Sequence, residues 1–235
     1  MSIITKTDAE IDLMREPCAI VRDTLAFVGE RISAGMSTKE VDELVERFIR
    51  AAGAYPSCLG YGGFPASACV SVNEVVVHGI PDDKTILKDG DIVTVDLCAY
   101  KNGFHGDAAR TFLIGNVSEE KRLLVERTKE CFFKGIENLH AGTPLYDIGY
   151  RVQKYAESFG YGVIRSYTGH GIGREMHEDP AVPNYGRLGT GPRLKANTVI
   201  CIEPMISMGN YRVRILDDDW GAVTIDGSPA AHYEN

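Results

Sequence analysis

The sequence lacks a membrane-length hydrophobic run, a secretory signal and a cluster of basic residues. Its first 18 residues, MSIITKTDAEIDLMREPC, mix charged and apolar side chains, which excludes a signal peptide, and no later stretch approaches a membrane span. The net charge is −8, from 33 acidic and 25 basic residues, so we expect no strong nucleic-acid binding, which needs a cationic surface. These absences favour a cytoplasmic protein.

Paired cysteine spacing is also absent. The six cysteines are scattered, without a CxxC motif, at positions 18, 58, 69, 98, 131 and 201. A chain of 235 residues with 44% hydrophobic residues can build a core without disulfides. We therefore interpret the cysteines as free thiols of a reducing compartment.

What is present is an order of elements that occurs twice. Apolar periodicity predicts two helices followed by strands in the first half, over 8–32, 37–53, 66–72, 91–100 and 104–115. The second half repeats this order, over 118–139, 143–160, 197–207, 211–218 and 221–226. Ser37 is a plausible helix cap and Gly53 a helix stop.

The two halves also match by position, at an offset of 107. Ala34-Gly35 recurs as Ala141-Gly142, and the same offset carries Asp96 onto Glu203. We interpret this as a duplicated unit that places one carboxylate of each half toward a shared central site. The prediction is one α+β domain over residues 1–235, with pseudo-symmetric halves of about 1–115 and 116–235.

Two of the acids lie inside a predicted hairpin. If Asn102-Gly103 is a two-residue turn, Asp96 pairs with residue 109 and Asp107 is its diagonal neighbour on the same face. Two such carboxylates repel each other, which raises a pKa. A shared proton, as in aspartic proteases, is one remedy, and a divalent metal is another.

Further acids favour the metal. Glu203 lies in an apolar strand that ends at Pro204, Glu234 lies at the end of the chain, and His170 lies in the glycine-flanked loop TGHGIG. A shared proton gives no reason for these residues, although each acid taken alone could be a salt-bridge partner. Four carboxylates and one imidazole suit two divalent ions, which make water nucleophilic at neutral pH and so predict hydrolysis.

The remaining histidines carry weaker signals. His78 follows a strand in VVVHGIP and His177 lies in GREMHEDP, and each alone is as consistent with a structural role as with a functional one. His105 shares a strand face with Asp107, which makes it a rival ligand or a neighbour of the ligands. His140 and His232 indicate only surface polarity.

Five segments together resemble type I methionine aminopeptidases: VHGIPDD, LKDGDIVTVDLCAYKNGFHGDAARTF, GHGIGREMHEDP, IEPM and DDDWGAVTIDGSPAAHYEN. The match runs from about residue 5 to the last residue. The family has a duplicated "pita-bread" fold, which agrees with the repeat. His170 and Glu203 are too close in sequence for the inserted helical subdomain of the type II enzymes.

The resemblance implies roles for individual residues. Two divalent cations (Co, Mn, Fe or Zn) would be held by Asp96, Asp107, His170, Glu203 and Glu234. His78 and His177 would contact substrate, Glu203 would be the general base toward the bridging water, and His177 and the metals would stabilise the oxyanion. The methionine side chain would lie among Cys58, Tyr61, Phe64, Cys69, Met176 and Trp220.

The implied function is removal of the initiator methionine from nascent proteins when the second residue is small. Nascent N-termini would be the partners, with a contact near the ribosomal exit tunnel as a further expectation, and the enzyme would be a monomer. Two alternatives stay open at this point. One is a proline-specific aminopeptidase or dipeptidase, and the other is a non-catalytic module of the same fold that binds protein or RNA.

Four residues depart from the family pattern. Met176 stands where phenylalanine is usual, Cys98 and Cys201 stand where threonine is common, and Asn235 replaces a histidine. The family also continues past Glu234 into a closing strand, whereas this sequence ends at residue 235. Strand alternation places Cys98 and Cys201 toward the metals, where they are either reactive thiols or inert packing residues.

Overall fold

The computed structural model describes residues 3–235, and its four long helices follow the predicted order. They are α1 (Asp8–Gly29), α2 (Thr38–Ala51), α3 (Glu119–Ile136) and α4 (Tyr146–Glu157). Ser37 caps α2 as predicted, because its hydroxyl accepts the Glu40 N–H while the Glu40 carboxylate accepts the Ser37 N–H. Gly53, the predicted stop, follows with a positive φ of 68°. Helices α1 and α3 end 107 residues apart, which is the offset of the sequence repeat.

The strands of the first half centre on a long hairpin. They are β1 (Tyr55–Pro56), β2 (Cys69–Val72), β3 (Val75–Val77), β4 (Ile92–Lys101) and β5 (Phe104–Leu113), and a 3-10 turn covers Tyr61–Gly63. Strand β4 pairs with β5 along its whole length and with β2 and β1 on its other edge. Asp96 lies opposite Ala109, so the predicted register of the hairpin is confirmed.

The strands of the second half are shorter. They are β6 (Gly162–Val163), β7 (Gly169–Gly171), β8 (Glu178–Val182), β9 (Met205–Ser207), β10 (Val213–Ile215), β11 (Ala222–Thr224) and β12 (Ala230–His232). They form a β12-β9-β6 sheet, a β7-β8 pair and a β10-β11 pair that β3 of the first half extends.

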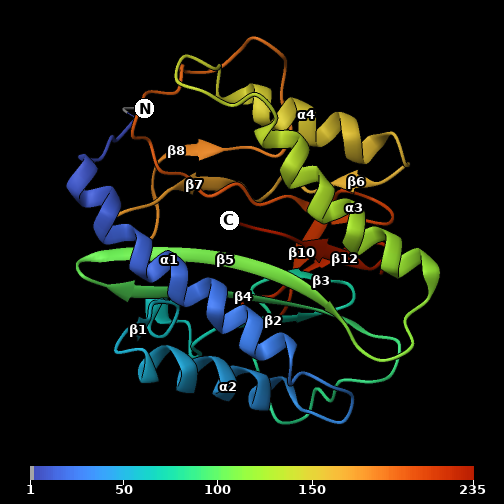
Figure 1. Ribbon diagram of the computed structural model, residues 1–235. Helices are drawn as coiled ribbons and strands as arrows, with labels where there is room; N and C mark the ends of the chain where they lie inside the picture. The colour runs from blue at the N-terminus through green and yellow to red at the C-terminus, as the bar shows by residue number, and fades with distance from the viewer. Residues whose placement is uncertain (1–2) are drawn as a thin grey trace.

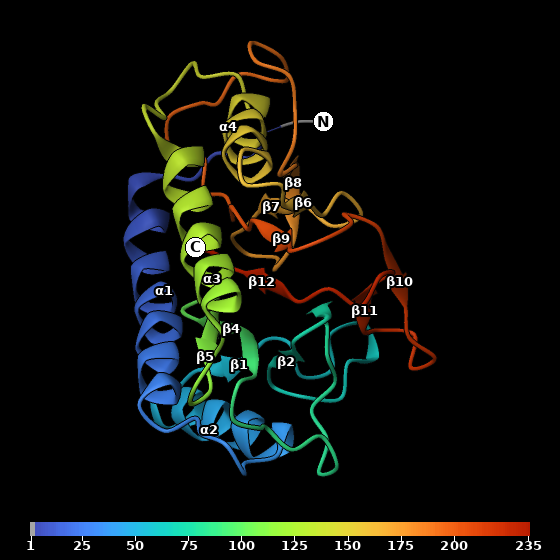
Figure 2. The same cartoon turned by 90° about the vertical axis from the view of Figure 1, so that its right-hand side faces the viewer.

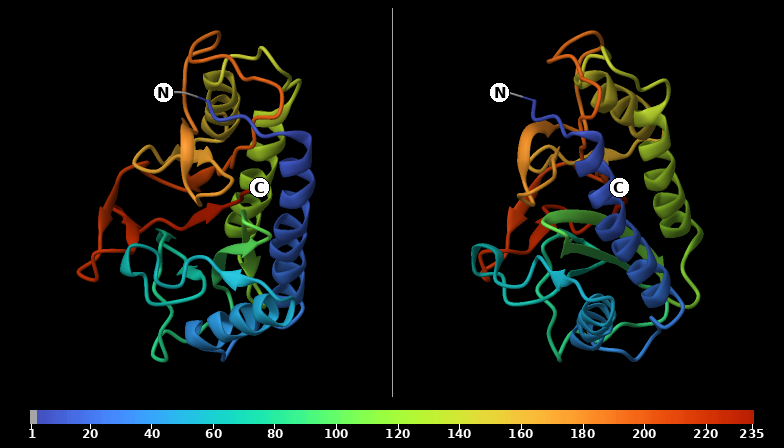
Figure 3. Two further views of the ribbon diagram at one scale, coloured as in Figure 1. Left: turned by 90° about the vertical axis from the view of Figure 1, so that its left-hand side faces the viewer. Right: turned by 60° about the vertical axis from the view of Figure 1, so that its left-hand side comes forward.

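Helices and strands occupy different sides of the molecule. Figure 1 shows α1 lying across β5 and β4. In Figure 2, α1 and α3 run along one side of the strands, with β10 and β11 on the opposite side, and the views of Figure 3 agree. The main core cluster packs α1 and α2 against β2, β4 and β5, and a second cluster packs α3 and α4 against β6, β9 and β12. The strands that pack against the helices therefore occupy the middle of the molecule. The C-terminus also lies there (Figure 1).

Two predictions about the second half need correction. The continuous strand expected over 197–207 is present only as β9, because Pro204 has no N–H for a ladder and separates Cys201–Glu203 from the strand. His170 lies in strand β7 rather than in a loop. Within residues 3–235, no helix is both long and apolar enough to cross a membrane.

Candidate metal centre and substrate pocket

One cavity of about 180 Å³ gathers all thirteen residues proposed for the site. The five proposed ligands lie at its acidic end: Asp96, Asp107, His170, Glu203 and Glu234. The others form its histidine-bearing rim and its apolar end: His78, His177, Cys58, Tyr61, Phe64, Cys69, Met176 and Trp220. Cys98 also lines the cavity. The sequence motifs, which are up to 176 residues apart, therefore meet in one place.

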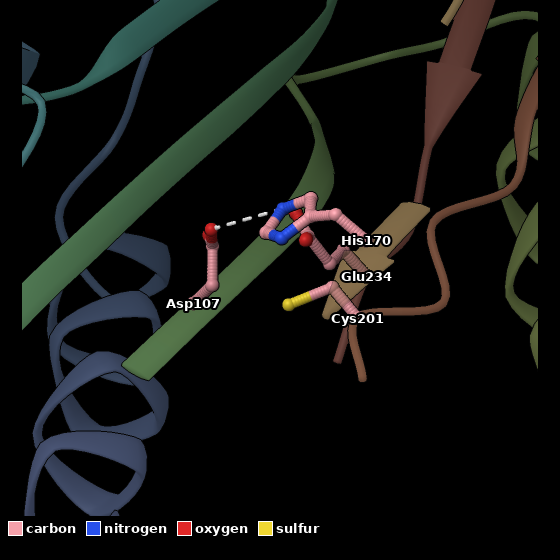
Figure 4. Close-up of side chains that lie close together, drawn as sticks. All are labelled: Asp107, His170, Cys201 and Glu234. Carbon is pink, nitrogen blue, oxygen red and sulfur yellow. Dashed lines mark ion pairs between the residues drawn. The ribbon is translucent and has the colours of Figure 1, made fainter. Parts of the chain in front are cut away.

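The acidic end is built from several strand segments. The β4-β5 register puts Asp96 and Asp107 on one face, as period-two alternation requires. His170 projects from β7, and its Nε2 lies 3.7 Å from Asp107 Oδ2 and 3.7 Å from Glu203 Oε1. Figure 4 shows the His170 ring and the Asp107 and Glu234 carboxylates turned toward one another. These side chains converge at distances that exceed a normal hydrogen bond.

Glycines explain how His170 comes so close to its neighbours. A Cβ on Gly169 would lie 2.3 Å from the Cys201 carbonyl oxygen, and a Cβ on Gly171 would lie 2.3 Å from the Asp179 carbonyl oxygen. Only glycine permits such backbone approach on both sides of the histidine. The Cys201 N–H also donates to the His170 carbonyl over 2.7 Å. The glycines flanking His170 therefore position the imidazole between two strand segments.

Glu234 is held by backbone contacts with the first half. Its N–H donates to the Ala109 carbonyl over 3.0 Å, and the Arg110 guanidinium donates to its carbonyl and to the Asn235 side chain. The Asn235 and Ile202 backbones exchange hydrogen bonds of 3.0 and 3.3 Å. These contacts extend the β5 edge to Glu234 and fix its side chain toward the cavity.

Burial makes the charged forms of the acidic residues costly. It raises the pKa of Asp96, Glu203 and Glu234 well above the usual range, and their mutual repulsion adds to the shift. Burial raises the pKa of Asp107 to about 6 and lowers the pKa of His170 to about 4. No lysine or arginine side chain lines the cavity in the part of the chain that the structure describes. The cluster is therefore a set of oxygen and nitrogen donors without a protein cation to balance it.

The donors fit a divalent cation. Ligand atoms of Asp107, His170, Cys201 and Glu234 all lie within 4.8 Å of one another. Asp107 Oδ1 is buried without a hydrogen-bond partner among residues 3–235, although buried carboxylate oxygens normally have one. Converging carboxylates and an imidazole are ligands that Mn²⁺, Fe²⁺, Co²⁺ and Zn²⁺ accept.

His232 was wrongly assigned to the surface by the sequence. Its side chain is only 1% exposed, and its Nε2 lies 3.9 Å from Glu203 Oε2 and 3.8 Å from Glu234 Oε2. Neither ring nitrogen has a hydrogen-bond partner in the described chain, and burial lowers the pKa of His232 to about 3. The available signal was its spacing of two residues from Glu234, which alternation places on the same face.

Two histidines lie at the rim of the cavity. His177 is exposed in the turn between β7 and β8, where its Nδ1 lies 2.7 Å from the Tyr61 hydroxyl and its ring centroid 4.3 Å from that of His170. His78 stands at a positive φ of 59° after β3, with its ring 5.2 Å from Tyr167 and 6.4 Å from Trp220. Burial lowers the pKa of both imidazoles, which favours their neutral forms.

The far end of the cavity is apolar. Cys58, Phe64, Cys69, Cys98 and Met176 are buried in one cluster, against which Trp220 packs. The Phe64 and Trp220 rings meet edge to face at 5.1 Å. This end suits an apolar side chain, while the acidic end suits polar chemistry.

Other sequence expectations fall outside the cavity. His105 does not line it, because its Nδ1 lies 2.9 Å from Ser57 Oγ and its ring packs on Tyr100. His140 is exposed, as predicted. All six cysteines are free, and burial raises the pKa of Cys98 and Cys201, so neither is an activated thiolate in the metal-free protein.

Four buried carboxylates and a neutral imidazole in a cavity between duplicated halves are the features of a metallohydrolase. The chain matches metallopeptidase family M24 over residues 12–226 and belongs to that family of divalent-metal enzymes. It is 54% identical over 233 residues to a methionine aminopeptidase of Clostridium acetobutylicum, covering 99% of this chain and 93% of the relative. Within M24, the chain belongs to the methionine aminopeptidases, which are metallo-exopeptidases.

Solved structures agree. A methionine aminopeptidase from Thermotoga maritima has 43% identity and a TM-score of 0.97, with 99% of this chain and 94% of that chain covered. A prolidase from Pyrococcus furiosus has 25% identity and a TM-score of 0.77, with 99% of this chain and 61% of that chain covered. The predicted pita-bread fold is therefore confirmed, and the methionine enzymes are more similar than the proline-specific one.

Proposed function

We propose that this protein removes the initiator methionine from nascent polypeptides by two-metal hydrolysis when the second residue is small. The observation that carries the proposal is the cavity itself, with an apolar end beside a cluster of four carboxylates and an imidazole. The proposed setting is the cytoplasm, with the enzyme acting as a monomer on N-termini near the ribosomal exit tunnel. We propose that residues 1–235 act as one catalytic domain.

Five residues would hold the cations: Asp96, Asp107, His170, Glu203 and Glu234. Four carboxylates are more anionic charge than one divalent ion balances, which supports two ions. When bound, such ions lower the pKa of water and polarise a carbonyl oxygen, the chemistry that peptide hydrolysis needs at neutral pH. The residues themselves move the protons and orient the substrate.

Glu203 is the proposed general base. Its carboxylate accepts a proton from the attacking water and passes it to the amine that leaves, which is the exchange that a carboxylate with a raised pKa favours. In the tautomer in which Nδ1 accepts a hydrogen bond from the Tyr61 hydroxyl, His177 donates from Nε2 to the carbonyl oxygen as charge develops there. His78, which also lines the cavity, contacts the peptide beyond the scissile bond.

Peptide hydrolysis with and without metal tests the proposal. Met-Ala-Ser with a free amine is expected to be cleaved after methionine, whereas N-acetyl-Met-Ala-Ser and Ala-Pro-Ser are not. Chelation should reduce the rate by about a thousandfold or more, and Co²⁺ or Mn²⁺ should restore it. Full activity after exhaustive chelation, or faster release of alanine from Ala-Pro-Ser, would contradict the proposal.

His232 is a proposed positioning residue for the two glutamates that it faces. We expect His232→Leu to weaken metal binding about 10–100-fold, because leucine replaces the imidazole that faces the Glu203 and Glu234 carboxylates at 3.9 and 3.8 Å with a side chain that has no N–H. His232→Gln, which keeps an N–H donor, should retain most of the affinity. Metal affinity measured by titration into the chelated protein checks both variants.

Thermal unfolding of the chelated protein separates a positioning role of His232 from a structural one. If His232 only positions the glutamates, the chelated His232→Leu variant should unfold at the wild-type temperature or above, because leucine removes a buried imidazole that lacks hydrogen bonds. If the Leu and Gln variants bind metal as tightly as the wild type, His232 does not position the glutamates.

A further inference from the structure

The Cys201 thiol lies among the proposed metal ligands and not only among apolar side chains. Its sulfur, Asp107, His170 and Glu234 form one group of donors within 4.8 Å, and Figure 4 shows the sulfur turned toward the carboxylates and the imidazole. Glu203, two residues further on, lines the cavity together with Asp107, His170 and Glu234. The Cys201 sulfur is therefore close enough to the other donor atoms to bind the same cation.

The placement of this sulfur is fixed by the backbone. The Cys201 N–H donates to the His170 carbonyl over 2.7 Å, and the next residue, Ile202, exchanges hydrogen bonds with Asn235. Apolar side chains of Met14, Phe104 and Ile172 close the side of Cys201 that faces away from the acids. The thiol is thus held at the boundary between an apolar cluster and the donor group.

A second observation, buried donor atoms without hydrogen-bond partners, points to a ligand at this group. Asp107 Oδ1 and both ring nitrogens of His232 are buried without hydrogen-bond partners in residues 3–235. Two ligands that each lie about 2.0–2.3 Å from one ion are at most about 4.6 Å apart. The donor atoms of the group lie within 4.8 Å of one another, so a small movement would bring all of them within that span.

We propose that Cys201 Sγ is a direct ligand of one cation in this centre, in addition to the five oxygen and nitrogen ligands. The inference rests on the metal-dependent function proposed above. Binding through sulfur forms a metal–sulfur bond and releases the thiol proton to solvent. A sulfur donor shifts the preference of this centre toward Zn²⁺, Co²⁺, Fe²⁺ and Cd²⁺ and away from Mn²⁺.

Electronic absorption of the Co²⁺-loaded protein tests the assignment. The wild type is expected to show a near-ultraviolet sulfur-to-cobalt charge-transfer band beside the visible cobalt bands, and Cys201→Ser and Cys201→Thr should lose the former while keeping the latter. Cys98→Ser is the matched control, because Cys98 is equally buried and lies opposite Asp107 on the neighbouring strand. Cys131→Ser, in α3, controls for loss of a buried thiol away from the cavity.

Two further measurements extend the test to selectivity and to the unmutated protein. Cys201→Ser should lower the preference for Cd²⁺ over Mn²⁺ about tenfold or more. X-ray absorption at the cobalt or zinc edge of the wild type should show a sulfur neighbour at about 2.3 Å, and this readout does not depend on how a variant folds.

The outcomes separate this inference from the proposed function. Three results would overturn the role of Cys201 and leave the metal-dependent hydrolase intact. They are visible cobalt bands without a charge-transfer band, a charge-transfer band that Cys98→Ser removes instead, and X-ray absorption without a sulfur neighbour. Failure of the wild type to bind Co²⁺ or any other divalent ion would overturn both.

Discussion

Replacing Glu203 with glutamine is expected to lower kcat for a Met-Ala peptide about 10²–10⁴-fold. The amide has the shape of the carboxylate but cannot accept a proton from water, and it carries no charge to balance a cation. The Glu203 carboxylate faces His170 at 3.7 Å on one side and His232 at 3.9 Å on the other. We therefore expect no neighbouring side chain to take over its role as the base. Steady-state kinetics together with metal content per chain check the result.

The two proposed roles of Glu203 give different metal contents. If Glu203 acts mainly as base, the variant keeps both metals and loses turnover, whereas a ligand role also reduces metal content. Asp147→Asn is a matched control, because Asp147 is a buried carboxylate of α4 that accepts the Gly189 N–H at 2.6 Å away from the cavity. Near-normal turnover of the Glu203→Gln variant with full metal content would exclude both roles.

Local rules predicted the acidic face of the first half from the sequence. The Asn102-Gly103 turn has positive φ at both residues, 56° and 83°, which fixes a two-residue hairpin and with it the register of Asp96 and Asp107. The repeat then located Glu203 without any knowledge of strand pairing. Both inferences depend on short-range geometry, which is why they could be made from one sequence.

Long-range pairing hid the role of His232. Strand β12 has only three residues, and its burial depends on its pairing with β9, which lies about 25 residues earlier in the chain. The flanking Ala230 and Ala231 give no amphipathic pattern that would distinguish a buried strand from a surface loop. A histidine in such a segment becomes a site residue only through tertiary contacts.

Backbone chemistry explains the two errors about strands. Pro204 interrupts the apolar run over 197–207, and the residues before it pair with β7 and the C-terminal segment instead of continuing β9. The glycines beside His170 indicated a loop, yet they are present because strand backbones approach closely there. Glycine supports both structures, and only the neighbouring strands decide between them.

The second large effect is expected from His177→Ala, which should lower kcat about 10²–10³-fold with little change in metal content. His177 stands in the β7-β8 turn at the rim, and its Nδ1 hydrogen bond with Tyr61 leaves the Nε2–H free to donate to a carbonyl oxygen. A donor that strengthens its bond as charge develops acts on kcat rather than on KM. Kinetics on a Met-Ala peptide measure both constants.

Tyr61→Phe distinguishes orientation from substrate packing. It keeps the ring that lies 5.1 Å from His177 but removes the hydroxyl that holds Nδ1, so kcat should fall by about tenfold while KM changes little. His140→Ala, an exposed histidine after α3, should leave both constants unchanged. If His177→Ala instead raises KM and leaves kcat intact, His177 binds the substrate equally in the ground and transition states, and oxyanion stabilisation must come from elsewhere in the cavity.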